Sequence, residues 1–260
     1  MLHRCPGVEQ TLVSVPELFS CPHCDQEMEI WRDERKGTCS ACAKHVARRE
    51  AIDYAVKISQ KHLQTAMGDE ITLAVCEAVD SEGEVLYYER YEAVVPLSTI
   101  EHHSKYKKAC EACKRHGTNL ACPPFSPTFH HYTQGKESAR VICLRLPLEY
   151  FDGELLQDRY RLCFKKVRGF LVEELSTSRE AGYTVAGAGP CMACERCVAE
   201  EGFSECSKPD QRIFSLESLG VNLMELAKRC FGISLEWSSD SHTAHFVCAM
   251  GAVFFQGDAA

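Results

Sequence analysis

The amino-acid sequence predicts an α+β protein, in which helices lie on one face of a mixed or mainly antiparallel sheet that follows a small N-terminal module. Two observations support this prediction. Runs rich in β-branched and aromatic residues alternate with two helical patterns of apolar residues. Four cysteines also form two Cys-x2-Cys pairs within the first 46 residues, a segment too short to build its own core. With 45% hydrophobic and 25% charged residues, the 260-residue chain has the composition of a folded globular protein.

The N-terminal module carries the pairs Cys21-Pro-His-Cys24 and Cys39-Ser-Ala-Cys42. Two such pairs at this separation place four thiolates at the corners of a tetrahedron, as in a structural zinc ribbon. Because so short a segment buries little apolar surface, zinc ligation would supply its folding energy. The sequence therefore predicts a zinc ribbon over residues 1–46, with Cys21, Cys24, Cys39 and Cys42 as ligands.

Residues 47–68 are predicted to form a helical connector. Ile52, Val56 and Leu63 lie roughly on one helical face, and the stretch 46–67 contains neither glycine nor proline. The main domain, residues 69–260, then begins with two strand-like stretches at 71–78 and 84–95. The sequence Asp-Ser-Glu-Gly between them is typical of a hairpin turn.

The rest of the main domain alternates strand and helix patterns. A strand is predicted at 141–146, followed by a long helix whose apolar positions make Cys163 a core residue. A short strand at 183–185 and a second helix at 216–230 follow, and Ser215 is placed to cap that helix. Two closing strands are predicted at 233–237 and 244–255.

The chain holds 17 cysteines, which the fold must explain. The N-terminus shows no basic flank before an apolar run of about 7 to 15 residues, the pattern of a secretory signal. No apolar stretch approaches about 18 residues, the length of a membrane span. We therefore expect a cytoplasmic protein without a membrane segment, because a reducing compartment keeps thiols free to bind metal.

Seven main-domain cysteines form two groups with metal-site spacing. The first group is Cys110, Cys113 and Cys122, and the second is Cys191, Cys194, Cys197 and Cys206. The run Cys-x2-Cys-x2-Cys of the second group favours a 4Fe-4S cluster, because such a loop lets three thiolates reach three irons. Four thiolates could instead hold one zinc ion, although a third cysteine at this spacing is unusual for zinc.

The first group repeats part of this spacing 84 residues earlier, but Lys107 stands where the second group has Cys191. Three thiolates would leave one iron of a cluster with an open position, where metal sites do chemistry. Candidate fourth ligands are His116, His130, His131, water or a substrate, and Cys206 could also cross over from the second group.

At these residues the chain resembles an uncharacterised family of predicted metal-binding proteins, domain of unknown function 2284. The resemblance covers roughly residues 70 to 255. It rests on the seven cysteines, the Cys-Pro-Pro-Phe turn at 122–125 and the helix start Ser215-x-Glu-x-x-Gly. The resemblance implies metal binding, for which we expect iron-sulfur chemistry, and it implies no particular reaction. The N-terminal ribbon lies outside the resemblance, as an accessory module.

The leading hypothesis is an iron-sulfur protein of redox or sulfur-related metabolism that carries two 4Fe-4S clusters and one zinc. Its partner would be a redox protein or a small anionic or sulfur-containing ligand. The alternative is a non-enzymatic, zinc-only adaptor whose basic run at 101–116 recruits nucleic acid or a protein. The net charge of −8 argues against nucleic acid, since an acidic protein repels it.

Overall fold

The computed structural model divides the chain into two compact units, residues 1–62 and 63–260, which are described separately. It describes residues 16–31, 34–67, 71–79, 85–151, 156–235 and 244–257. The predicted hairpin turn at 80–83 lies outside these residues. No helix in the described ranges is long and apolar enough to cross a membrane.

The first unit is built from two short antiparallel hairpins and the start of a helix. Met28, Ile30 and Val46 are buried together with two of the cysteines, and Ala51 from the helix joins them. This core is very small, as expected for a segment of this length. The elements are β1 (Pro16–Ser20), β2 (Glu27–Trp31), β3 (Lys36–Thr38), β4 (His45–Ala47) and α1 (Arg48–Met67).

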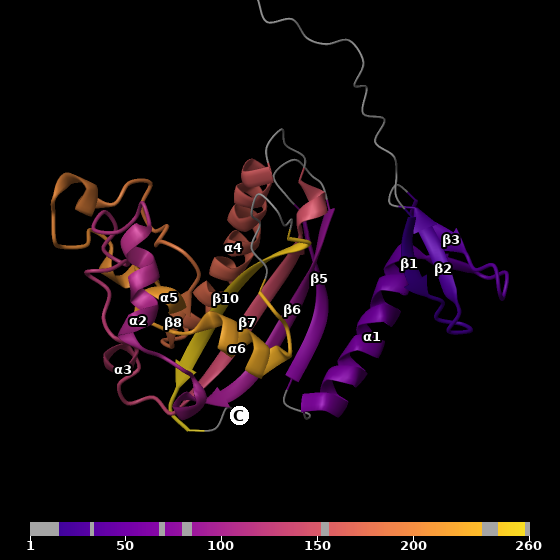
Figure 1. Ribbon diagram of the computed structural model, residues 1–260, viewed down its shortest axis with the longest axis horizontal. Helices are drawn as coiled ribbons and strands as arrows, with labels where there is room; N and C mark the ends of the chain where they lie inside the picture. The colour runs from indigo at the N-terminus through magenta and orange to yellow at the C-terminus, as the bar shows by residue number, and fades with distance from the viewer. Residues whose placement is uncertain are drawn as a thin grey trace, which may run out of the picture. The chain divides into compact units, whose positions relative to one another are not determined.

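The second unit contains a six-stranded sheet in the order β5-β6-β7-β10-β8-β9 (Figure 1). All neighbouring pairs are antiparallel except β8 and β9, which are parallel. The α+β class and the mainly antiparallel sheet are therefore confirmed. The strands are β5 (Ile71–Val79), β6 (Val85–Pro96), β7 (Ser138–Pro147), β8 (Thr184–Gly187), β9 (Phe214–Ser215) and β10 (Phe246–Phe255).

Helices cover both faces of this sheet, whereas the sequence predicted one. Helix α4 (Leu156–Glu180) packs on one face, where Phe170 stacks on Tyr88 of β6 at a centroid distance of 5.0 Å. Tyr91, also on β6, contacts Phe231 of α6 (Leu223–Phe231), with ring centroids 5.7 Å apart. Since side chains alternate along a strand, Tyr88 and Tyr91 point to opposite faces. The second layer comes from the short helix α6, which buries Leu226, Ala227, Cys230 and Phe231.

Several element predictions can be compared directly. Cys163 is fully buried on α4, as its position in the helical pattern predicts. The helix predicted at 216–230 is two helices, α5 (Leu216–Leu219) and α6, because Gly220 adopts a left-handed conformation with φ 91° and ends the first. The strand predicted at 233–237 was wrong for residues 233–235, which are irregular, and its last two residues lie outside the described ranges.

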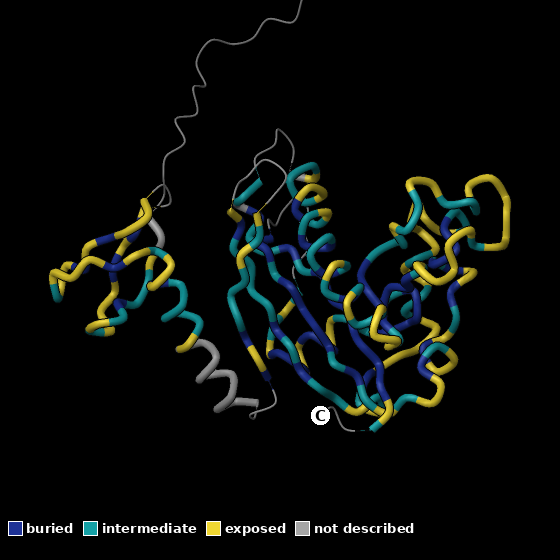
Figure 2. Tube along the Cα trace, turned by 180° about the vertical axis from the view of Figure 1, so that it is seen from behind, coloured by how far each residue is buried: buried dark blue, intermediate teal, exposed yellow. Residues whose placement is uncertain are grey.

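The two main-domain cysteine groups lie on loops and short helical turns beside the β8–β9 end of the sheet (Figure 1). Figure 2 shows these loops largely exposed, next to strands that are mostly buried. Loops thus carry the candidate ligands and the sheet holds the loops in place. The short helices in this region are α2 (Ser104–Lys107), η2 (Lys108–Ala112), α3 (Phe129–Tyr132), η4 (Val198–Glu201) and η5 (Pro209–Gln211).

Candidate metal centres

The four N-terminal cysteines lie on two turns of the same shape, one after β1 and one after β3. In each turn, the residue four places after the first cysteine donates its N–H to that cysteine's carbonyl. These residues are Asp25 and Ala43, and the two bonds measure 2.9 and 2.8 Å. Both residues adopt positive φ, at 59° and 58°. The two cysteine pairs therefore meet in matching conformations.

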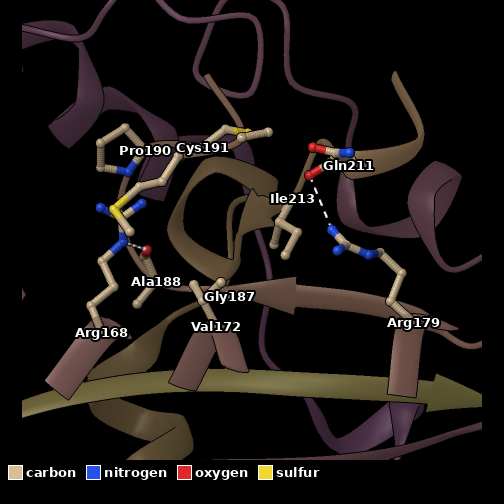
Figure 3. Close-up of a pocket in the computed structure, with 12 residues that line it drawn as sticks. Arg168, Val172, Arg179, Gly187, Ala188, Pro190, Cys191, Gln211 and Ile213 are labelled. Atoms are coloured by element: carbon tan, nitrogen blue, oxygen red, sulfur yellow. Dashed lines mark hydrogen bonds between the residues drawn. The ribbon is translucent and has the colours of Figure 1, made fainter. Parts of the chain in front are cut away.

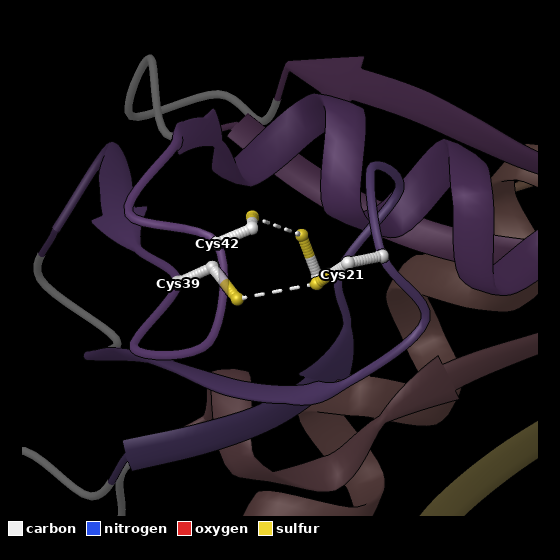
Figure 4. Close-up of side chains that lie close together, drawn as sticks. Cys21, Cys39 and Cys42 are labelled. Atoms are coloured by element: carbon white, nitrogen blue, oxygen red, sulfur yellow. Dashed lines mark hydrogen bonds between the residues drawn. The ribbon is translucent and has the colours of Figure 1, made fainter.

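The thiols of these turns face one another closely. The Sγ atoms of Cys21 and Cys42 are 3.7 Å apart, and those of Cys24 and Cys39 are 3.6 Å apart. All four sulfurs lie within 4.8 Å of one another, and Figure 4 shows the two loops opposed. Four thiolates about 2.3 Å from one tetrahedral ion stand about 3.8 Å apart, so the spacing fits a single ion. The backbone N–H of Cys42 lowers the pKa of the Cys39 thiol to about 7, which favours its ligating form.

The second cysteine group lines one small cavity in the main domain. Cys191, Cys194 and Cys197 come from the loop after β8, and Cys206 comes from the loop before η5. All four line the cavity, together with Asn119, Leu120, Ala121, Ala193 and Arg212. The structure therefore brings the fourth cysteine to the other three despite the eight residues between them.

Polar contacts join the segment of the first group to the segment of the second. The Leu120 N–H donates to Sγ of Cys197 at 3.4 Å. The Asn119 amide donates to the Cys191 carbonyl, also at 3.4 Å. Nearby, Arg115 forms a 3.1 Å ion pair with Glu200. The two cysteine groups consequently lie side by side, although about 80 residues separate them in the sequence.

The thiols of the first group are neighbours of one another. Burial, together with the charges of Cys113 and Cys110, raises the pKa of Cys122 to about 11. Burial also raises the pKa of Cys110, with Glu217 and Cys113 adding to the effect. Thiols that influence one another in this way would be ionised together only by a bound metal.

The predicted histidine ligands of the first group lie on the surface, as Cys113 of that group does. His116, His130 and His131 are all exposed. Cys206 lines the cavity of the second group. Lys107, which replaces a fourth cysteine in the repeated spacing, donates instead to the carbonyls of Ser126 and Pro127 at 3.1 and 2.7 Å.

One buried cation lies between the two groups. Arg168 lies on α4, and its Nε donates a 2.6 Å hydrogen bond to the carbonyl of Ala188 (Figure 3). Ala188 precedes Cys191, the first cysteine of the second group. Burial lowers the pKa of Arg168, while the charges of Cys191, Glu217 and Cys122 oppose that effect. The guanidinium is thus close to thiols of both groups and suited to balance negative charge there.

The sequence of the main domain identifies the family. A family model described as predicted metal-binding protein, domain of unknown function 2284, matches residues 93–254. The chain belongs to this family. The match spans all seven cysteines of the two main-domain groups, and the four cysteines of the ribbon-like N-terminal module precede it. No curated protein and no solved structure matches the chain.

Two residues of this family member escaped the sequence analysis. Arg168 lies in the predicted long helix, and arginine in a helix is ordinarily a surface residue. Nothing in the sequence therefore indicates that Arg168 is buried near the cysteines. Glu217 was visible only as part of the helix-start motif that the family resemblance uses. In the structure its carboxylate lies near Cys110 and Arg168.

Proposed function

We propose that the protein is an iron-sulfur protein of redox or sulfur-related metabolism. Cys191, Cys194, Cys197 and Cys206 would hold one 4Fe-4S cluster, and the first group would hold a second with three thiolates. The N-terminal cysteines would hold one zinc. The observation that carries the proposal is the single cavity lined by all four cysteines of the second group, next to the three thiols of the first.

The sulfur spacing supports different metals at different sites. Among the described residues, only the N-terminal four bring their ligand atoms within 4.8 Å of one another. Each thiolate of a cubane binds a different iron, so cubane thiolates stand farther apart than those around one zinc ion. A spacing wider than 4.8 Å in the main-domain groups is compatible with iron-sulfur clusters.

The surroundings of the second group suit an anionic cluster. The Leu120 N–H points at the Cys197 sulfur, as backbone donors do around cluster thiolates. Arg168 supplies a buried positive charge, and such a charge stabilises a cluster that gains an electron. A bound cluster here would supply one-electron transfer, while the chain fixes its ligands and its electrostatic environment.

The first group supports a ligand-binding role. Its three thiolates leave one position of a cubane without a cysteine, and a small anionic or sulfur-containing ligand could bind there. Two cations of the basic run at 101–116 already have partners in the protein. Lys107 donates to the carbonyl of Pro127, and Arg115 forms an ion pair with Glu200. This engagement disfavours the adaptor alternative.

Cysteine variants test the assignment of the two groups. Cys194→Ser and Cys113→Ser, each purified without oxygen, should each lose about four iron atoms per chain and keep about one zinc. Cys76→Ser is the matched control, because Cys76 lies on β5, outside both groups, and its variant should keep all the iron. Zinc loss in either ligand variant, or unchanged iron in both, would refute the assignment.

A further inference from the structure

The first part of strand β10 has a neighbouring strand on one side only. Strand β7 pairs with all of β10, from Phe246 to Phe255, whereas β8 pairs only with Ala252–Phe254. Beside residues 246–250, no strand of the described chain lies on the β8 side. Side chains from the helices that cover the sheet therefore border this edge of β10.

A cavity of about 260 Å³ lies at this edge, and its wall is mainly apolar. Cys248 and Met250 of β10 form one part of the wall. Helices from both faces of the sheet contribute to the rest, with Tyr160 and Phe164 from α4 and Leu223 from α6. These three helical side chains are only half-buried, so a small molecule can reach the cavity from solvent.

The size and the lining of the cavity define the kind of molecule that fits. An apolar cavity of about 150 Å³ holds benzene, so this larger one has room for about two fused aromatic rings. The rings of Tyr160 and Phe164 favour an aromatic ligand, because aromatic rings pack well against one another. A mainly apolar wall with few polar groups is typical of small-molecule sites.

Glu217 of α5 supplies a carboxylate to this wall. Its Oε2 atom has no hydrogen-bond partner among the described residues, and other atoms of the residue are partly exposed. Buried polar atoms nearly always have a partner. A ligand that donates one hydrogen bond would provide the partner that this carboxylate lacks.

A buried cation next to the cavity favours a neutral ligand. Arg168 donates to the carbonyl of Ala188, which lines the cavity. A Cβ atom at Gly189 would lie 3.3 Å from Nε of Arg168 and 3.4 Å from Cε1 of Phe164, so the guanidinium lies near the aromatic wall. Burial raises the pKa of Glu217, and the charge of Arg168 is one of the effects that oppose this. A cationic ligand would be repelled by Arg168, whereas a neutral donor would not.

We propose that this cavity binds a neutral aromatic molecule of about two fused rings, which donates one hydrogen bond to the Glu217 carboxylate. The inference goes beyond the proposed function and does not depend on which metal the cysteines bind. Ala188 lines the cavity, and Gly189 and Pro190 alone separate it from Cys191 in the sequence. A molecule held here would therefore lie beside the second cysteine group.

Indole is a suitable probe, because it is neutral, has two fused rings and carries one N–H donor. Benzofuran is the matched control ligand, since it has nearly the same shape with an oxygen in place of the N–H. Calorimetric titration of the full chain, purified without oxygen, measures both affinities. Indole should bind wild type about tenfold more tightly than benzofuran, because only indole supplies the hydrogen bond. Glu217→Leu should remove this preference.

Two tryptophan variants test the location of the site. Leu223→Trp should abolish indole binding, because the larger side chain fills the cavity. Met224→Trp is the matched control, since Met224 is exposed on the same helix, and it should bind indole as wild type does. Should Leu223→Trp fail to fold, as judged by circular dichroism, alkylation of wild type by iodoacetamide decides. Indole should slow the reaction of Cys248, which lines the cavity, and leave that of Cys76 on β5 unchanged.

Four results would overturn this inference and leave the proposed function standing. They are no binding of indole to wild type, equal affinities of wild type for indole and benzofuran, unchanged indole binding by folded Leu223→Trp, and alkylation of Cys248 that indole does not slow.

Discussion

The backbone N–H of Leu120 donates a 3.4 Å hydrogen bond to the sulfur of Cys197, which joins the two cysteine groups of the main domain. Leu120 is two residues from a member of the first group, and it is almost fully buried. The bond places a loop of one group against a thiol of the other. Two clusters held by these groups would be close enough to share the charges around them, and the buried Arg168 is the principal one.

Arg168 is therefore expected to raise the reduction potentials of both clusters. Reduction adds negative charge, and a buried cation stabilises the reduced form more than the oxidised one. Arg168→Met should lower both potentials, whereas Arg168→Lys should lower them less because it keeps the charge. A potentiometric titration followed by paramagnetic resonance measures the change.

Arg179→Met is the control for this prediction. Arg179 lies on the same helix and lines the same cavity as Cys191, but its guanidinium donates to the carbonyl of Gln211 (Figure 3). Its variant should leave the potentials unchanged. Equal shifts for Arg168→Met and Arg179→Met would mean that Arg168 acts through helix packing alone.

The N-terminal module should depend on its metal for folding. Its core contains only a few apolar side chains, and two of its buried residues are the cysteines Cys21 and Cys39. Cys39→Ser should therefore release about one zinc per chain and unfold the module, since metal binding supplies its folding energy. Metal analysis and limited proteolysis after purification would show this. Iron should stay at the wild-type level, and a parallel loss of iron would show that the two sites are not independent.

Gly220 should be more sensitive to substitution than other left-handed glycines. Gly220→Ala combines an unfavourable φ of 91° with a Cβ atom 3.0 Å from the His103 oxygen. Gly182 has a similar φ of 88°, but a Cβ there meets nothing within 4 Å. Gly182→Ala should cost about 1–2 kcal/mol of unfolding free energy, and Gly220→Ala clearly more. Denaturant unfolding compares them, and equal costs would show that the approach of α5 is not tight.

Much of the fold could be predicted because its signals are local. The helical pattern of α4 and the alternating strands β5 to β7 are visible in the sequence, and Cys163 is buried as that pattern requires. The break at Gly220 was missed because the apolar pattern continues through it, although glycine commonly ends a helix in this left-handed conformation. The helix that forms the second layer was predicted within 216–230, but its place on the opposite face of the sheet depends on tertiary contacts such as that between Tyr91 and Phe231.

The candidate site divides in the same way. Spacing alone marks the cysteines, because ligands on one loop must be close in sequence. The contact between Leu120 and Cys197 joins positions 77 residues apart, and only the folded chain reveals it. Arg168 lies near the thiols through tertiary packing alone, and no motif in the sequence marks it.

The content of iron, acid-labile sulfide and zinc in protein purified without oxygen tests the central claim most directly. If the chain holds two 4Fe-4S clusters and one zinc, each chain should contain about eight iron atoms with matching sulfide, and about one zinc. Two or three zinc ions and no iron, persisting after anaerobic reconstitution with iron and sulfide, would contradict it and leave a zinc-only adaptor.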